Sequence, residues 1–241
     1  FCECGESVDP DSIHFLPPLC PQSRAASEYE YQEKQKIRAK ADLRRQRQQL
    51  AQHLREKIVD VIPPLFSKAR LHKLNSVFKT QCIETINQGL GLVLYGPTGR
   101  GKSFAMCALL RWLLARSYEG GGKYWRDAKR ISAERLNLEI RDAFKKDSDR
   151  SELDVIKPYL IPSVLLLEDL GAGKSVIGVE SDFSIRVIYV LLDTRIEQQK
   201  LTLITTNKTQ SNLAGSFDDR IASRLSVFKW VGIGGKDKRS C

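Results

Sequence analysis

Short, continuous apolar runs in the second part of the chain predict buried β-strands. Three of these runs cover residues 90–95, 164–167 and 201–205, and residues 124–131 are the candidate for a further strand. Amphipathic stretches that predict helices separate the runs, at residues 102–117, 133–146 and 183–199. Strands that alternate with helices are typical of an α/β fold, in which helices cover both faces of a parallel sheet.

Residues 25–61 follow a different pattern. They contain neither Gly nor Pro and predict one long helix, which Pro63 and Pro64 stop. Between Lys34 and Lys57, nine basic residues outnumber two acidic ones. The apolar residues follow helical spacing only loosely, so we expect a narrow apolar stripe and a broad solvated face. The helix is thus either a solvated connector or an arm that docks on a partner or on nucleic acid.

These patterns divide the 241 residues into a Cys-bearing N-terminal region (1–24), a basic helical arm (25–61) and an α/β domain (62–241). With 41% apolar and 28% charged residues, the composition is that of a globular protein. The longest apolar runs fall far short of the ~18–20 residues of a membrane helix, so we expect no membrane partner. Because the chain begins with Phe1 rather than Met, we expect further residues before it.

Charge and cysteine content narrow the class of protein. The net charge of +10 favours a polyanionic partner, with nucleic acid the first choice. The six cysteines are too irregular for a secreted disulfide framework, so we expect a cytoplasmic protein. Cys82 and Cys107 lie in apolar helical patterns and are expected in the core.

The strongest motif is the run Gly96-Pro97-Thr98-Gly99-Arg100-Gly101-Lys102-Ser103, which matches the P-loop pattern G-x-x-x-x-G-K-[ST]. A predicted strand precedes it and a predicted helix follows. Backbone N–H groups of such a loop surround the β-phosphate of ATP, aided by the N-terminal end of the following helix. We expect Lys102 to reach the β- and γ-phosphates and Ser103 to bind Mg²⁺.

Glu168 and Asp169 end the second predicted strand and are the Walker B candidates. Carboxylates at the carboxyl edge of a central strand can hold the metal and orient a water for attack on the γ-phosphate. We expect Glu168 to serve the Mg²⁺ and Asp169 to polarise the water. Many ATPases of this type place Asp first, and the short side chain of Asp169 makes slow hydrolysis a further expectation.

Two later motifs supply groups that act on the γ-phosphate. Asn207 lies just after the predicted strand at 201–205. At this position a side-chain amide can orient the attacking water. Arg220 and Arg224 are four residues apart and so share one helical face. A guanidinium supplied by a neighbouring subunit would stabilise the transition state and make hydrolysis depend on assembly. The alternative is a surface helix with an ion pair to Asp218 or Asp219.

In this order the motifs resemble those of AAA+ ATPases, specifically the DnaC/IstB-like group of replicative helicase loaders and transposition helper ATPases. The resemblance covers residues 62–239; segments 96–103, 165–171, 205–207 and 219–225 resemble Walker A, Walker B, sensor 1 and the arginine-finger box. It implies that Arg224 is a finger acting in trans within a ring or spiral, with Arg220 as second choice. Residues 235–239 resemble the closing G-x-D-x-R of the group, which implies Arg239 as sensor 2.

The N-terminal region bears on which member of the group this is. Helicase loaders of the group carry a small helicase-docking region there, in some cases with bound zinc. Residues 2–4 and 20–23 resemble the two halves of a zinc ribbon, but the first half is C-x-C and Ser23 stands in place of the last cysteine. The two interpretations are a metal-free remnant and a Zn²⁺ site made of Cys2, Cys4, His14 and Cys20.

Loaders of this kind hold single-stranded DNA on the inner face of the assembly by phosphate neutralisation and base stacking. The candidate contacts here are Arg141, Phe144, Lys145 and Lys146, followed by Tyr124, Trp125 and Arg126. The motifs predict an ATPase that depends on ATP and Mg²⁺, and the resemblance implies that it loads a hexameric replicative DNA helicase onto single-stranded DNA.

Three other functions fit the same motifs. One is an IstB-like transposition helper that marks target DNA for a transposase. The second is a P-loop kinase for a small molecule, which would not need Arg224. The third is a nucleotide-gated DNA-binding scaffold with negligible turnover, which the Glu168-Asp169 order makes plausible.

Overall fold

The computed structural model describes residues 21–118, 127–143, 151–172, 182–214, 219–235 and 237. The chain divides into two units, Phe1–His53 and Leu54–Cys241. In the first unit, the described residues form most of helix α1 (Pro21–Val61), which confirms the predicted long helix. From Ala26 to His53 its side chains are exposed except for Glu33. Exposed pairs such as Lys34–Glu30, at 3.4 Å, add little to its stability.

The second unit is built on a parallel sheet with the strand order β2-β3-β4-β1-β5. Its strands are β1 (Leu92–Tyr95), β2 (Ala128–Ser132), β3 (Val164–Glu168), β4 (Leu201–Thr206) and β5 (Lys229–Gly232). In the register, Leu203 pairs with Leu92 and Leu201 with Val164. The strand β4 therefore lies between β1 and β3, although it follows both in the sequence.

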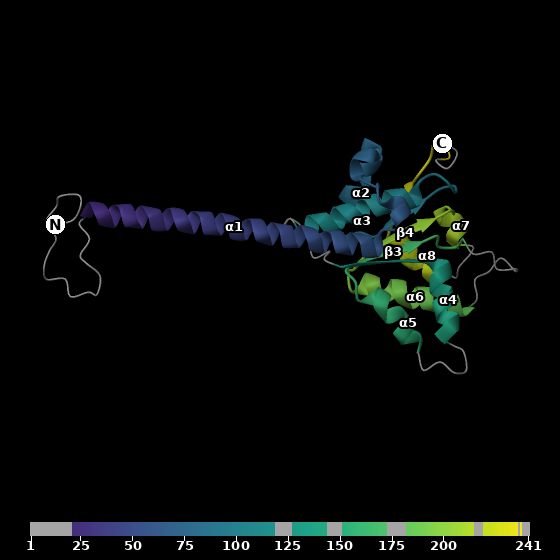
Figure 1. Ribbon diagram of the computed structural model, residues 1–241. Coiled ribbons are helices and arrows are strands. Elements are labelled where there is room, and N and C mark those ends of the chain that lie inside the picture. Colours follow the sequence, from purple (N-terminus) through teal and green to yellow (C-terminus); the bar gives the residue numbers. More distant parts are fainter. Residues whose placement is uncertain are drawn as a thin grey trace. The chain divides into compact units, whose positions relative to one another are not determined.

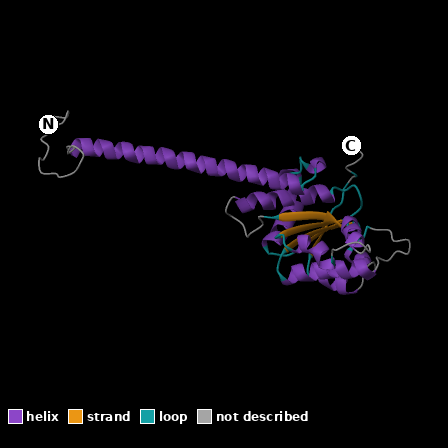
Figure 2. Cartoon of the chain, turned by 60° about the horizontal axis from the view of Figure 1, so that its bottom comes forward, coloured by secondary structure: helices purple, strands orange, loops and turns teal. Residues whose placement is uncertain are grey.

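Helices cover both faces of this sheet, as Figures 1 and 2 show. On one face lie α2 (Ser76–Asn87) and α3 (Lys102–Tyr118). On the other lie α4 (Ala133–Ala143), α5 (Glu152–Leu160), α6 (Asp182–Glu197), α7 (Gln210–Ala214) and α8 (Asp219–Ser226). The α/β fold predicted from the alternating pattern is thereby confirmed.

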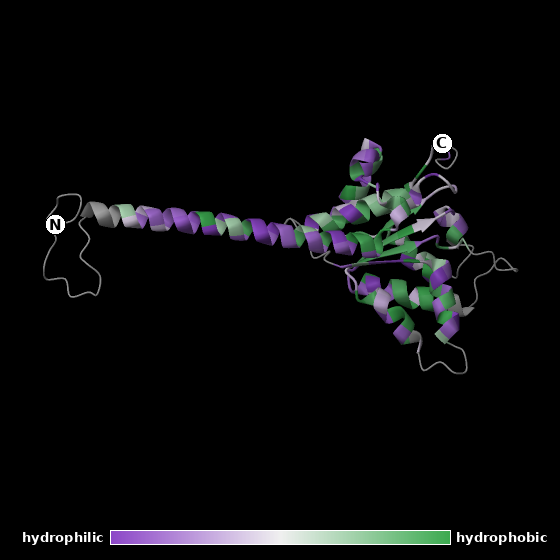
Figure 3. Cartoon of the chain, in the orientation of Figure 1, coloured by the Kyte–Doolittle hydropathy of each residue, from purple (hydrophilic) through white to green (hydrophobic). Residues whose placement is uncertain are grey.

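The central strands β1, β3 and β4 are buried along almost their whole length because helices pack against both faces of the sheet (Figure 3). Successive side chains of a strand point to opposite faces. Leu165 and Leu167 accordingly join the core beneath α4, α5 and α6, whereas Leu166 joins the core beneath α2 and α3. All residues of β3 are buried. A buried central strand is a rigid base for the polar residues that follow it.

Local signals set several element boundaries. Two 3-10 turns, Pro64–Phe66 and Leu71–Lys73, follow α1, and proline cannot continue the helix. The Asn75 side chain accepts a hydrogen bond from the N–H of Phe78 and caps α2. Ser151 and Asp154 form a capping box at the start of α5.

The structure differs from the sequence expectations in small ways. The strand expected within 124–131 is β2, while residues 124–126 lie outside the described residues. Strand β5 was not anticipated, since Lys229–Gly232 has only one fully buried residue. Cys82 and Cys107 are buried as expected, and burial raises the pKa of each thiol to about 12. Within the described residues, no helix is long and apolar enough to cross a membrane.

Candidate functional site

The P-loop joins β1 to α3 at the carboxyl edge of the sheet. Its backbone requires glycine at Gly96, Gly99 and Gly101, whose φ angles are 145°, 81° and 88°. A Cβ at Gly96 would also lie 2.4 Å from the carbonyl oxygen of Ile233. The loop is thus held tightly against the chain that leaves β5. Its geometry is that expected of a phosphate cradle at a helix N-terminus.

Lys102 is the first residue of α3 and is only 6% exposed. Its Nζ donates hydrogen bonds to the carbonyl oxygens of Gly96, at 2.7 Å, and Pro97, at 3.0 Å. It also donates to Oδ1 of Asn207, at 2.6 Å. A buried ammonium needs such oxygens, and phosphate oxygens would meet the same need with a stronger, charge-assisted bond.

Asn207 comes directly after β4, the strand that adjoins β1. Its contact with Lys102 places the predicted sensor amide beside the predicted phosphate-binding lysine. These two residues are far apart in sequence, and the sheet order brings them together because the carboxyl ends of parallel strands share one edge.

Glu168 is the last residue of β3 and is 3% exposed. Burial raises the pKa of its carboxyl group, while Arg130 and the Ser103 hydroxyl oppose the rise. Arg130, on the adjacent strand β2, forms an ion pair with Oε2 of Glu168. The buried Oε1 has no hydrogen-bond partner among the residues that the structure describes.

An orphaned carboxylate oxygen close to a serine hydroxyl fits a hard cation such as Mg²⁺, which prefers oxygen ligands. Ser103 and Glu168, the residues predicted from the sequence, are therefore the groups that would hold it. Among the described residues, no cluster of three or more His, Cys, Asp or Glu side chains forms a further metal site.

Asp169 differs from Glu168 in its exposure and in its backbone conformation. It is exposed and adopts a left-handed backbone with φ of 54°. Its N–H donates to Oγ1 of Thr205, at 2.9 Å, and its carbonyl accepts from the N–H of Ala172, at 3.1 Å. This tight turn fixes the backbone and leaves the carboxylate at the surface of the carboxyl edge.

Arg220 and Arg224 lie on α8, as expected from their spacing. Arg224 donates from Nε to Oδ1 of Asp193 and from Nη2 to the hydroxyl of Tyr189, at 3.1 Å. Its pKa is raised, first by the hydrogen bond to Asp193. Arg220 lies over the Tyr189 ring with Cζ 5.7 Å from its centroid. Arg224 is thus paired with residues of α6, while Asp218, one of the two partners expected from the sequence, lies outside the described residues.

Sequence reasoning missed three residues at this site: Arg130, Asp193 and Tyr189. A lone arginine on a short strand and an acid on an amphipathic helix have no local signature. Only the pairing of β2 with β3, and of α6 with α8, shows that they contact predicted site residues.

The closing motif reaches the P-loop through Asp237. A Cβ at Gly99 would lie 2.2 Å from Oδ1 of Asp237, so this carboxylate lies directly against the loop. Several predicted residues fall outside the described residues: Arg239, Phe144, Lys145, Lys146, Tyr124, Trp125, Arg126 and the zinc candidates Cys2, Cys4, His14 and Cys20. Arg141 is described and exposed at the end of α4.

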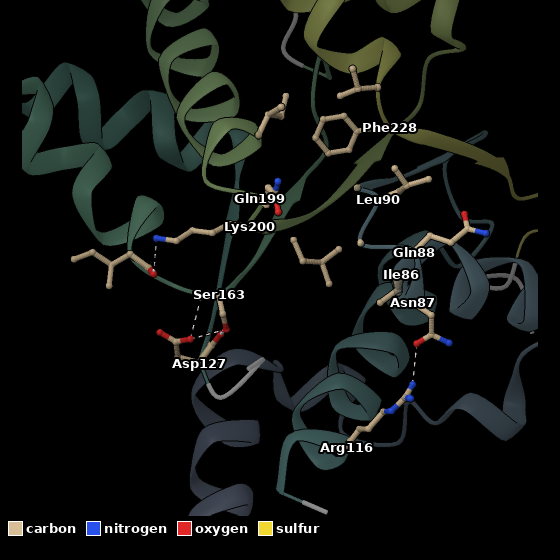
Figure 4. A pocket seen from close by; sticks show the side chains of 16 residues that line it. Ile86, Asn87, Gln88, Leu90, Arg116, Asp127, Ser163, Gln199, Lys200 and Phe228 are labelled. Carbon is tan, nitrogen blue, oxygen red and sulfur yellow. Dashed lines mark hydrogen bonds between the residues drawn. The ribbon is translucent and has the colours of Figure 1, made fainter. Parts of the chain in front are cut away.

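A cavity of about 1000 Å³ lies at the opposite, amino edge of the sheet. Figure 4 shows Leu90, Ser163, Lys200 and Phe228 around it, and these residues immediately precede or lead into β1, β3, β4 and β5. The P-loop follows β1 instead. The cavity is therefore separate from the nucleotide site.

Comparison with known proteins extends the resemblance seen in the motifs. No family model matches the chain. Over 130 residues, or 54% of the chain, it is 27% identical to the replicative helicase loader DnaI of Bacillus subtilis strain 168. The match spans 37% of the length of that relative, so just over a third of it is covered.

Solved structures show the same fold. The match to a crystal structure of DnaI covers 74% of this chain and 94% of the DnaI chain, with a TM-score of 0.58 and 21% sequence identity. A DnaC helicase loader matches 71% and 99%, with a TM-score of 0.55 and 20% identity. AMPPCP-bound DnaA from Aquifex aeolicus matches 72% and 52%, with a TM-score of 0.55 and 17% identity. The chain thus shares the α/β fold of these proteins, and its sequence is similar to that of a helicase loader, in line with the resemblance predicted from its motifs.

Proposed function

We propose that this protein is an ATP-dependent loader that places a hexameric replicative DNA helicase on single-stranded DNA. The observation that carries the proposal is the contact of Lys102 with Asn207 beside Glu168 at one edge of the sheet. The arrangement supports the proposal because an ATPase needs a phosphate-binding, a sensing and a metal-binding group close together. The similarity to the loader DnaI supports the choice of partner.

In this mechanism the P-loop backbone binds the phosphates of ATP, and Lys102 exchanges its carbonyl partners for phosphate oxygens. Ser103 and Glu168 would hold Mg²⁺, which would supply positive charge to neutralise the phosphates. Asp169 polarises the attacking water, and Asn207 holds it in line with the γ-phosphate. Arg224 of a neighbouring subunit completes the site, so that hydrolysis depends on assembly.

Single-stranded DNA is the proposed polyanion. Arg141 is an exposed cation on α4 and supports a phosphate contact there. The basic residues of α1 offer a second cationic surface. The helicase is proposed to bind the N-terminal region, which lies outside the described residues.

Two features of the acidic residues favour a second candidate function, a nucleotide-gated DNA-binding scaffold with negligible ATP turnover. Glu168 is neutralised by Arg130, and the exposed Asp169 is one methylene shorter than a glutamate. Both features favour slow hydrolysis. Measuring ATP turnover with and without single-stranded DNA separates the scaffold from the loader, because the scaffold shows no stimulated turnover.

Calorimetry with ATP and Mg²⁺ tests the nucleotide site. We expect the wild type to bind and Lys102→Ala to lose binding, because its buried ammonium is the main cation of the P-loop. Lys200→Ala is the matched control, since Lys200 also donates to carbonyl oxygens but at the opposite edge. Unchanged ATP binding in folded Lys102→Ala contradicts the proposal.

Affinity capture tests the partner. The full-length protein is used as bait in the presence of ATP, and bound proteins are identified before and after hydrolysis. We expect a replicative helicase that leaves after hydrolysis. Recovery of a transposase in its place identifies a transposition helper.

A further inference from the structure

The contact of α8 with α6 is built around one aromatic ring and one carboxylate. Ile221 and Leu225 of α8 are buried, which leaves Arg220 and Arg224 on another face of the short helix. Tyr189 and Asp193 are four residues apart on α6 and so share one face as well. The two arginines of α8 meet these two residues of α6.

Arg224 is held by one side of its guanidinium. Nε donates to Asp193, Nη2 donates to the Tyr189 hydroxyl at 3.1 Å, and Cζ lies 5.4 Å from the centre of the Tyr189 ring. Three contacts from two residues fix both the position and the plane of the group. Such a plane is what bidentate recognition of a phosphate requires.

The other side of the same guanidinium is open. Among the described residues, no acceptor receives a hydrogen bond from Nη1 of Arg224, and the side chain is 36% exposed. Asp193 is less exposed, at 24%. The carboxylate therefore lies on the inner side of the pair, and the free N–H groups lie on the outer side, where an anion can reach them.

We propose that Asp193 and Tyr189 are positioning residues that hold Arg224 with its Nη1 side outward, ready for the γ-phosphate bound to an adjacent copy of this chain. This inference rests on the proposed function, because it assigns to Arg224 a role in a neighbouring site. A free arginine side chain samples many rotamers, and ordering it only at assembly would weaken its effect on the reaction. The pair on α6 removes that cost before the subunits meet.

The opposite arrangement makes a different prediction. If Asp193 held Arg224 away from the neighbouring site, removing the carboxylate would release the arginine and raise turnover. A positioning role requires that turnover fall. The two directions are distinguished by one kinetic measurement on the assembled protein.

The test measures ATP turnover of the full chain with single-stranded DNA, over a range of ATP concentrations. We expect Asp193→Asn to lower kcat by about tenfold with little change in KM, because substrate binding is left to the other subunit. Asp193→Glu should recover part of the loss. Tyr189→Phe keeps the ring and loses the hydroxyl, so we expect a fall of about threefold. Glu197→Gln, an exposed carboxylate at the end of α6, is the matched control and should keep wild-type kcat.

Mixing two inactive chains tests the action in trans. Asp169→Asn should bind ATP without hydrolysing it and still present Arg224, whereas Arg224→Ala keeps its own nucleotide site. In an equal mixture, about a quarter of the interfaces join an intact site to an intact arginine, so turnover should return to that level. Adding Asp193→Asn to the Asp169→Asn chain should lower the recovered turnover by about tenfold, as it does in the single variant.

The outcomes separate this inference from the function on which it rests. If Arg224→Ala alone keeps full stimulated turnover, both the role of Arg224 and its positioning are overturned. If Arg224→Ala loses turnover but Asp193→Asn and Tyr189→Phe keep it, or if Asp193→Asn raises kcat, only the positioning role is overturned.

Discussion

The two edges of the β-sheet differ in how completely their buried charged side chains are hydrogen-bonded. At the carboxyl edge, Glu168 and Arg130 pair with each other, yet Oε1 of the one and Nε of the other are buried without partners. At the amino edge, Arg195 is 0% exposed and its described hydrogen bonds go to neutral oxygens. Unmet polar atoms thus lie at the edge that we propose binds ATP, and satisfied ones lie at the edge that holds the fold together.

Arg195 shows how the amino edge is satisfied. It donates to the hydroxyl of Thr202 and to the carbonyl oxygens of Tyr159, Pro162 and Leu201, at 2.8 to 2.9 Å. Burial lowers the pKa of Arg195 to about 10. The side chain thereby joins α6, β4 and the connection from α5 to β3.

The largest effect is expected from Arg195→Met. It leaves several buried acceptors without a donor, so we expect the free energy of unfolding to fall by about 3 kcal/mol. Chemical denaturation measures the change. Lys200→Met removes a less buried cation from the same edge and should cost less than about 1 kcal/mol. Equal losses in the two variants would contradict the distinction between buried and peripheral cations at this edge.

A smaller effect, visible in catalysis rather than in stability, is expected from Arg130→Met. Burial raises the pKa of Glu168, and Arg130 lowers it, so removal of Arg130 raises that pKa further. Because Mg²⁺ requires the ionised carboxylate, the acidic limb of the pH profile of ATP turnover should move to higher pH.

The same carboxyl group also links pH to stability. Since its pKa is raised in the folded state, protonation of Glu168 stabilises the fold, and this contribution is lost as the pH rises through the folded-state pKa.

The control for the turnover profile of Arg130→Met is Arg135→Met, which breaks an exposed pair with Glu139 on α4. It should leave the pH profile of ATP turnover unchanged. An unshifted profile in Arg130→Met would show that Arg130 does not tune Glu168.

The smallest effect is expected on the reactivity of the two buried cysteines, which can report on the charge of Glu168 at the carboxyl edge. Glu168 is one of the groups that raise the pKa of Cys107, whereas burial alone raises that of Cys82. Glu168→Gln should therefore increase the alkylation rate of Cys107 modestly and leave that of Cys82 unchanged. Peptide mass spectrometry after timed alkylation reads both rates in one sample. Parallel acceleration of the two thiols would indicate general loosening instead.

The sequence predicts the parts of the site that depend on local pattern. The P-loop, the two acids at the end of β3, Asn207 after β4 and the long helix α1 follow from motifs and periodicity, and the structure places these residues at those positions in the fold. The pairs Arg130–Glu168 and Arg224–Asp193 depend on which strands and helices become neighbours. Single residues carry no periodic signal of such contacts. Strand β5 was missed for a related reason, because its partner β1 and not its own composition makes it a strand.

The position of β4 also bears on how the protein is made. Strand β1 and the P-loop leave the ribosome before the hydrogen-bonded neighbours of β1, which are β4 and β5, the last two strands of the sheet along the sequence. The nascent chain therefore holds its phosphate loop on an unpaired strand until these two strands have emerged. Long-range pairing of this kind slows folding and prolongs the exposure of apolar strands to chaperones.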